Sequence, residues 1–149
     1  MNNGVSVLLI EDETDIRKIL EYNLKLEGFT VYSAANGRAG LKIACKKKPD
    51  VILLDWVMPE MNGLEVLSEL RNDERTKGII VFMLTAKNML DDVVTALANG
   101  ADDYIPKPFE GAELGPRIMS MLKVLRARKG DNACESEEII RLSPLKNDR

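Results

Sequence analysis

The sequence predicts an α/β protein: a doubly wound parallel sheet of five strands flanked by five helices. Short apolar runs alternate five times with longer segments in which apolar residues recur every three or four positions. The central runs are apolar throughout, which is typical of strands covered by helices on both faces. Regular alternation of strand and helix favours a parallel sheet whose crossover helices lie on its two faces.

Each element is expected where its own periodicity is clearest. The strands are expected at residues 5–10, 29–33, 51–54, 79–84 and 103–105. The helices are expected at residues 14–27, 36–48, 63–71, 90–98 and 114–125. In the first helix the predicted buried stripe consists of Ile16, Ile19, Leu20 and Leu24.

Glycine and proline mark the expected helix ends. Gly28 follows the first helix at a position where left-handed backbone is common, so it is expected to end that helix. Pro116 lies within the last helical segment, and its ring removes a backbone donor. We therefore expect Pro116 to kink the last helix or delay its start.

The pattern predicts one domain over residues 1–126, followed by a polar linker or tail over residues 127–149. The few apolar residues near the end are too few to build a second core. No apolar run approaches the roughly 20 residues that span a bilayer, and no signal peptide is recognisable. A cytoplasmic protein that does not enter a membrane is expected.

The charge and the missing residue types exclude several functions. The net charge is −3 at pH 7, so there is no basic excess to hold nucleic acid. The chain contains no histidine, which removes serine–histidine and cysteine–histidine nucleophile pairs and histidine metal ligands. Its two cysteines give no disulfide framework. Acid–base or metal chemistry must therefore use other side chains.

Polar side chains follow four of the five predicted strands. Glu11 and Asp12 come after the first strand, Asp55 after the third, Thr85 after the fourth and Lys107 after the fifth. In a doubly wound sheet these strand ends meet at one crevice. Clustered carboxylates repel each other and are compensated by a hard divalent cation such as Mg²⁺. A carboxylate, a hydroxyl and an ammonium beside Mg²⁺ are equipment for phosphoryl transfer.

Four motifs carry a specific resemblance. They are LLIEDE at 8–13, ILLDWVMPEMNG at 52–63, MLTA at 83–86 and GADDYIPKPF at 100–109. With all four in order, the chain resembles the receiver domain of bacterial two-component response regulators over residues 5–126. The resemblance implies a flavodoxin-like receiver fold. It also implies a switch that takes a phosphoryl group from a sensor histidine kinase and catalyses only its own phosphorylation and dephosphorylation.

The resemblance implies a Mg²⁺ site. Asp55 is similar to the phosphoacceptor aspartate. Asp12 resembles the acid that binds Mg²⁺ directly, and Glu11 the acid that acts largely through water. The backbone carbonyl of Val57 completes the implied set of metal ligands.

The resemblance also implies how the phosphoryl group is read. Thr85 is expected to hydrogen-bond to it, and Lys107 to pair with it. Tyr104 stands at the aromatic position that switches with phosphorylation.

The resemblance is greatest to receivers of OmpR/PhoB-type winged-helix transcription factors. It implies a homodimer through the fourth helix, fifth strand and fifth helix, with Asp103, Glu113 and Arg117 in the interface. The chain has no helix-turn-helix, so it is not expected to bind DNA itself. It is either the receiver piece of a longer transcription factor or a stand-alone receiver that acts by protein contacts.

A phosphatase of the haloacid-dehalogenase type is the alternative from another class, since it also uses an aspartate nucleophile on a parallel sheet. Such enzymes need a second acid two residues after the nucleophile. Here that position is Val57.

Overall fold

The computed structural model of the chain describes residues 4–85, 90–106 and 111–130. The strands are β1 Ser6–Ile10, β2 Thr30–Ala34, β3 Val51–Asp55, β4 Ile80–Thr85 and β5 Asp103–Pro106. The helices are α1 Thr14–Leu26, α2 Gly37–Lys47, α3 Gly63–Arg71, α4 Leu90–Ala98 and α5 Gly111–Gly130. The ten predicted elements are confirmed in type and order, and most of their ends lie within one or two residues of the expectation.

The five strands form one parallel sheet in the order β2-β1-β3-β4-β5. The chain leaves β1 toward one edge of the sheet to form β2 and then returns past β1 to form β3. The direction of winding therefore changes between β1 and β3. Ligands of doubly wound sheets bind beside this position, outside the carboxyl ends of the strands.

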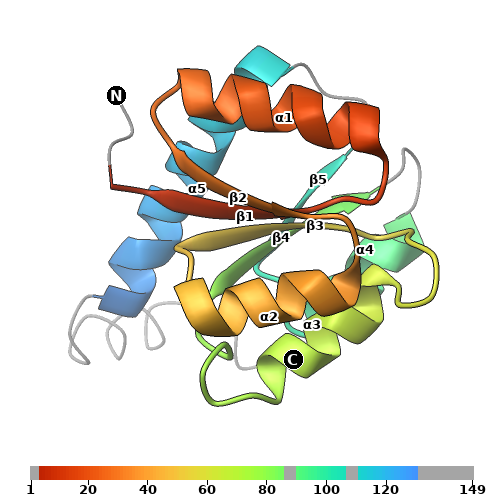
Figure 1. Cartoon of the computed structure of the whole chain (residues 1–149). Helices are drawn as coiled ribbons and strands as arrows, with labels where there is room; N and C mark the ends of the chain where they lie inside the picture. Colours follow the sequence, from red (N-terminus) through yellow and green to blue (C-terminus); the bar gives the residue numbers. More distant parts are fainter. Residues whose placement is uncertain (1–3, 86–89, 107–110, 131–149) are drawn as a thin grey trace. The chain divides into compact units, whose positions relative to one another are not determined.

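Two compact units are distinguished along the chain, residues 1–115 and residues 116–149. The first unit holds the whole sheet, and in it α1 lies on one face while α2 and α3 lie on the other (Figure 1). In the second unit α5 continues as a helix to Gly130. No helix among the described residues is long and apolar enough to cross a membrane.

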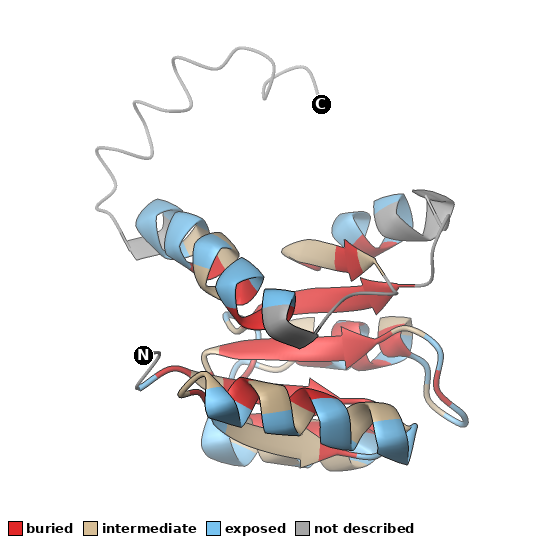
Figure 2. Ribbon diagram, turned by 90° about the horizontal axis from the view of Figure 1, so that it is seen from above, coloured by how far each residue is buried: buried red, intermediate tan, exposed pale blue. Residues whose placement is uncertain are grey.

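The sheet is the buried centre of the first unit (Figure 2). Every residue of β3 and β4 is buried. On one face Leu8, Ile10, Ile52 and Leu54 pack in a cluster with residues of α2, α3 and α4. Burial of each such side chain stabilises the fold by roughly 1.5–3 kcal/mol. The ends of β1 and β3 are therefore fixed by a well-packed core.

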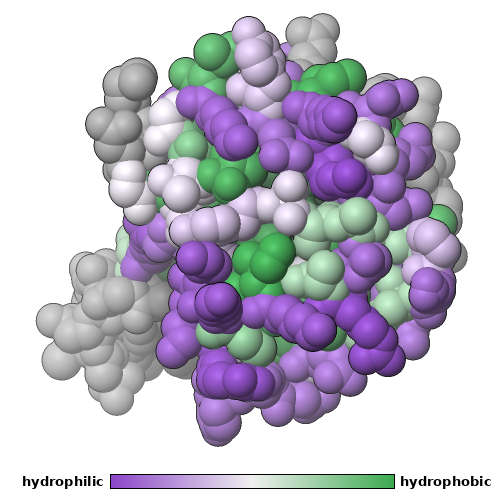
Figure 3. Space-filling model, in the orientation of Figure 1, coloured by the Kyte–Doolittle hydropathy of each residue, from purple (hydrophilic) through white to green (hydrophobic). Residues whose placement is uncertain are grey.

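Some apolar residues at helical spacing are exposed. Leu20 and Leu24 of α1 are buried, but Ile19 is 59% exposed, so its predicted burial is wrong. In α4, Ala96 is buried while the larger Val94 is 60% exposed. The spacing of apolar residues predicts a helix, but the neighbouring elements determine which of those residues are buried. Hydrophilic residues nevertheless dominate the face drawn in Figure 3, with apolar residues scattered among them.

Two expectations about helix ends are corrected and one is confirmed. Gly28, with φ 94°, follows the end of α1 as predicted. The start of α5 is not delayed, because the helix begins at Gly111 and Pro116 lies inside it. The other expected effect of Pro116, a kink, stays a prediction. The residue before Pro116 is a glycine, whose missing Cβ relieves the usual clash with the proline ring. The helix also extends past residue 126, since the arginine and lysine that follow are good helix formers.

Candidate functional site

The strand register brings the predicted acidic residues together. Ile10 of β1 pairs with Leu54 of β3, so Glu11 and Asp55 are the next residues along two neighbouring strands. The carboxylates of Glu11, Asp12 and Asp55 each offer an oxygen, and these oxygens lie within 4.8 Å of one another. The prediction that the acids converge at this edge of the sheet is confirmed.

The acidic cluster is shielded from water. Glu11 is fully buried, Asp55 is 5% exposed and Asp12 is half-buried. At about 5 Å and an effective dielectric near 20, each pair of carboxylates repels by roughly 3 kcal/mol. A donor set of carboxylate oxygens at this spacing can hold a hard divalent cation.

Both the backbone and the carboxylate of Glu11 form hydrogen bonds. Its backbone N–H donates to the carbonyl of Ala34 at 3.1 Å, which extends the pairing of β1 with β2. Its carboxylate Oε2 accepts the backbone N–H of Glu13 at 3.2 Å. Glu13 is the N-cap of α1 and its side chain makes no capping hydrogen bond. The Glu11 carboxylate thus lies at the beginning of α1, where the helix dipole favours a negative charge.

The end of β3 is held by the start of α3. The Trp56 N–H donates to the Leu84 carbonyl of β4 at 3.2 Å, and the Gly63 N–H of α3 donates to the Trp56 carbonyl at 2.8 Å. A Cβ at Gly63 would lie 2.5 Å from the Asp55 carbonyl oxygen, so only glycine permits this approach. Asn62 and Glu65 form a reciprocal cap on α3. The segment carrying Asp55 is therefore tightly placed.

Thr85 and Tyr104 come from the next two strands. Thr85 is 2% exposed at the end of β4, one residue beyond the partner of Asp55. It therefore lies at the same edge of the sheet as the acidic cluster. Tyr104 of β5 pairs with Met83, is half-buried and packs against the core cluster. Lys107, the expected ammonium of the site, lies outside the described residues.

The remaining predicted residues are placed as follows. The side chain of Val57 is 69% exposed in the loop after β3. Asp103 is half-buried on β5, while Glu113 and Arg117 are exposed on α5. The dimer interface assigned to these last three residues stays a prediction.

Sequence reasoning missed Arg17. Its guanidinium Nη1 donates to the backbone carbonyl of Glu11 at 2.8 Å and to that of Asp12 at 3.4 Å. A signal was present in the sequence, because Arg17 lies in the first turn of α1. A cation in the first turn is disfavoured by the helix dipole, so an arginine there indicates a compensating contact elsewhere.

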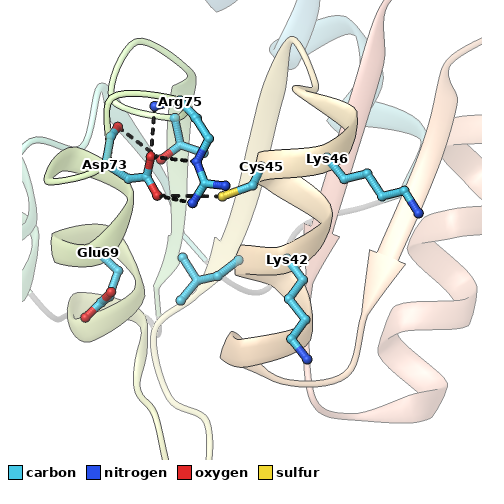
Figure 4. Close-up of a pocket in the computed structure, with 8 residues that line it drawn as sticks. Lys42, Cys45, Lys46, Glu69, Asp73 and Arg75 are labelled. Atoms are coloured by element: carbon cyan, nitrogen blue, oxygen red, sulfur yellow. Dashed lines mark hydrogen bonds and ion pairs between the residues drawn. The ribbon is translucent and has the colours of Figure 1, made fainter.

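A hollow of about 460 Å³ lies between α2 and the segment after α3, and none of the three residues of the acidic cluster lines it. Arg75 and Asp73 form an ion pair at 2.8 Å, and the Cys45 thiol lies 3.8 Å from the Asp73 carboxylate (Figure 4). Lys42 and Lys46 point away from that pair. The charges of this hollow do not converge on one point, so the candidate site remains the carboxyl edge of the sheet.

A family model and curated relatives match most of the chain. The family model of the response regulator receiver domain matches residues 7–119. The chain is 38% identical to the transcriptional regulatory protein PrrA of Mycobacterium bovis, over 99% of the chain and 62% of the relative. It is 37% identical to the phosphate regulon regulator PhoB of Pseudomonas aeruginosa, over 90% of the chain and 58% of the relative.

Solved structures match the fold of the chain. The chemotaxis protein CheY4 of Vibrio cholerae matches with a TM-score of 0.74 and 31% identity, over 78% of this chain and 98% of that one. A receiver domain protein from Clostridium thermocellum matches with a TM-score of 0.73 and 27% identity, over 82% and 97% of the two chains. The chain spans about 57–62% of the length of curated relatives such as RpaA of Synechocystis and PrrA.

Proposed function

Since the chain belongs to the response regulator receiver family, we propose that it is a signalling switch phosphorylated on Asp55. The observation that carries this proposal is the buried carboxylate at the end of β3, with two further carboxylates within 4.8 Å. Receivers are signalling proteins rather than enzymes that turn over a separate substrate. The catalysis proposed here is limited to the chain's own phosphorylation and dephosphorylation.

The proposed reaction is an in-line transfer. A carboxylate oxygen of Asp55 forms a bond to phosphorus, and the bond between phosphorus and the donor's imidazole nitrogen breaks. The electron pair of that bond leaves with the imidazole, and Asp55 becomes an acyl phosphate. The Thr85 hydroxyl donates a hydrogen bond to the phosphoryl group, and Lys107 pairs with its charge. Phosphorylation then draws Thr85 inward, which makes room for Tyr104 to turn.

Glu11, Asp12 and Asp55 would hold Mg²⁺, together with the backbone carbonyl of Val57. When bound, the cation neutralises the phosphoryl oxygens and the clustered carboxylates. Two or three carboxylates completed by water make a weak site rather than a tight cage. The carboxylate spacing and the all-oxygen donor set support this assignment.

The relatives suggest the partners and the output. PrrA and PhoB are named as transcriptional regulators, so we propose that this receiver is driven by a sensor histidine kinase in the cytoplasm and controls transcription. Residues 127–149, the first of which continue α5 to Gly130, are the proposed linker toward an effector domain. Asp103, Glu113 and Arg117 are the proposed contacts of a phosphorylation-dependent homodimer, which Arg117→Glu should disrupt in a mass measurement in solution.

The test uses the whole chain with acetyl phosphate and Mg²⁺, followed by intact mass measurement. Wild type should gain one phosphoryl group, and Asp55→Asn should gain none. Asp15→Asn removes an exposed carboxylate from α1 and serves as the matched control, which should react like wild type. Phosphorylation of Asp55→Asn at the wild-type rate would overturn the proposal.

The phosphatase alternative is not favoured. It requires an acid where the chain has Val57, whose side chain points into solvent. The same experiment tells the two apart: a receiver accumulates a stable acyl phosphate, whereas a phosphatase releases inorganic phosphate continuously from excess donor.

A further inference from the structure

One side chain spans the turn that presents the acidic cluster. Arg17 reaches back from α1, and its Nη1 donates to the carbonyls of Glu11 and Asp12. The backbone N–H of Arg17 donates to the Glu13 carbonyl at 2.9 Å, so the residue is anchored in the first turn of α1. Arg17 is half-buried, which limits competition from water for these bonds.

The same turn is held from its other side by Glu11. The Glu11 carboxylate accepts the Glu13 N–H, while the Glu11 carbonyl accepts from Arg17. The backbone between β1 and α1 is therefore fixed at successive residues. With this backbone fixed, the directions in which the Glu11 and Asp12 side chains leave the chain are also fixed.

We propose that Arg17 is a positioning residue for the cation site. It holds the backbone of the acidic pair so that both carboxylates face Asp55, and thereby raises the affinity of the site for Mg²⁺. This inference rests on the proposed function, because it concerns the same three carboxylates. Arg17 contacts the backbone of the ligand-bearing residues, and its action on the cation passes through them.

A positioning role and an electrostatic role of Arg17 predict opposite changes in Mg²⁺ affinity when the residue is removed. Arg17 is a cation beside an anionic cluster, so through charge alone it would weaken the binding of Mg²⁺. Removing it would then tighten binding. If Arg17 acts by positioning, removing it weakens binding. Loss of a residue that orients metal ligands typically lowers affinity about 10–100-fold.

The experiment titrates the whole chain with Mg²⁺ and follows the fluorescence of Trp56, which adjoins Asp55. Arg17→Ala should bind Mg²⁺ about tenfold more weakly than wild type. Arg17→Lys keeps the charge but loses the guanidinium geometry, so it should also bind more weakly. Lys18→Ala removes an exposed charge from the next position of α1 and is the control, with affinity close to that of wild type.

Two further readouts exclude a general loss of structure. Without metal, hydrogen exchange at the Glu13 amide should be faster in both Arg17 variants, while amides of β3 keep their protection. With acetyl phosphate, saturating Mg²⁺ should restore the phosphorylation rate of Arg17→Ala toward that of wild type.

The inference fails if Arg17→Ala binds Mg²⁺ as tightly as wild type or more tightly. It fails equally if the Glu13 amide is unaffected in both variants. Failure of the proposed function looks different: wild type itself would show no Mg²⁺ binding, or Asp55→Asn would still be phosphorylated.

Discussion

The two ends of the parallel sheet differ in the charges that their described residues bring together. At the carboxyl end, three carboxylates are gathered within 4.8 Å of one another. At the amino end, opposite charges and dipoles are matched. Arg71 at the end of α3 donates from Nε to Gly100 at 2.8 Å and pairs through Nη2 with Asp102 at 3.1 Å. The same Asp102 carboxylate accepts the Val81 N–H at 2.9 Å.

The amino ends of β1 and β3 follow the same rule. The Ser6 N–H donates to the Asp50 carboxylate at 2.8 Å, and the Asp50 N–H donates to the Ser6 hydroxyl at 3.0 Å. These half-buried polar groups thus meet partners of opposite polarity. We therefore expect the contacts at the amino end to add stability and the repulsion among the carboxylates at the other end to reduce it.

The largest effect on folding is expected for Arg71→Ala. Burial lowers the pKa of the Arg71 guanidinium, and the ion pair with Asp102 offsets only part of this effect. The variant loses bonds to Gly100, Lys77 and Ile79 and leaves Asp102 without its cation. Urea denaturation should show a loss of about 3 kcal/mol in the free energy of unfolding.

The control for that prediction is Arg75→Ala, whose ion pair with Asp73 is exposed. It should change the free energy of unfolding far less than Arg71→Ala does, because exposed ion pairs contribute little. Folded Arg71→Ala protein should still take a phosphoryl group at the carboxyl end. Equal losses of unfolding free energy in Arg71→Ala and Arg75→Ala would contradict the claim that the ion pair at the amino end of the sheet contributes more than an exposed one.

Gly63→Ala tests the packing that fixes the site. The added Cβ would lie 2.5 Å from the Asp55 carbonyl oxygen and 2.9 Å from Trp56 Cα, and backbone cannot move aside as easily as a side chain. We expect a loss of about 2 kcal/mol in stability and slower phosphorylation of Asp55. Gly78→Ala, where an added Cβ meets nothing within 4 Å, is the control and should leave phosphorylation unchanged.

Neutralising one acid should stabilise the metal-free protein. Asp55→Asn removes one of three neighbouring negative charges, so its free energy of unfolding in EDTA should rise by roughly 1 kcal/mol. Mg²⁺ at ten times its Kd should stabilise wild type by about 1.4 kcal/mol and the variant by less. A destabilised variant in EDTA would contradict the claim that the carboxyl end costs stability.

The smallest effect is expected at the exposed pair of Asp73 and Arg75. Hydrogen bonds from Arg75 lower the pKa of the Asp73 carboxyl from 3.8 to about 2. Because the folded pKa is below the unfolded one, the stabilisation is present above about pH 4 and is lost as pH falls toward 2. The stability difference between wild type and Asp73→Asn should therefore shrink over this range in urea titrations.

Much of the site could be predicted from the sequence because topology alone assembles it. Glu11, Asp55 and Thr85 each follow a strongly apolar strand, and parallel strands place their carboxyl ends at one edge. The fold class followed from the same alternation. These inferences need only the type and order of the elements, which hydrophobic periodicity gives.

The contacts that hold the site could not be predicted. Arg17 and Arg71 donate mainly to backbone carbonyls, and a carbonyl acceptor leaves no trace in residue identity. Ile19 was misplaced because an apolar residue at helical spacing faces the core only if a neighbour covers it. Such features depend on tertiary packing.

The central claim is that the buried carboxylate of Asp55 accepts the phosphoryl group. Borohydride reduces an acyl phosphate of aspartate to homoserine, which marks the modified residue by mass. The chain treated with acetyl phosphate and Mg²⁺, reduced and digested, should carry homoserine at position 55, and EDTA should abolish it. Homoserine at another aspartate, or its formation in EDTA at the same rate, would contradict the account.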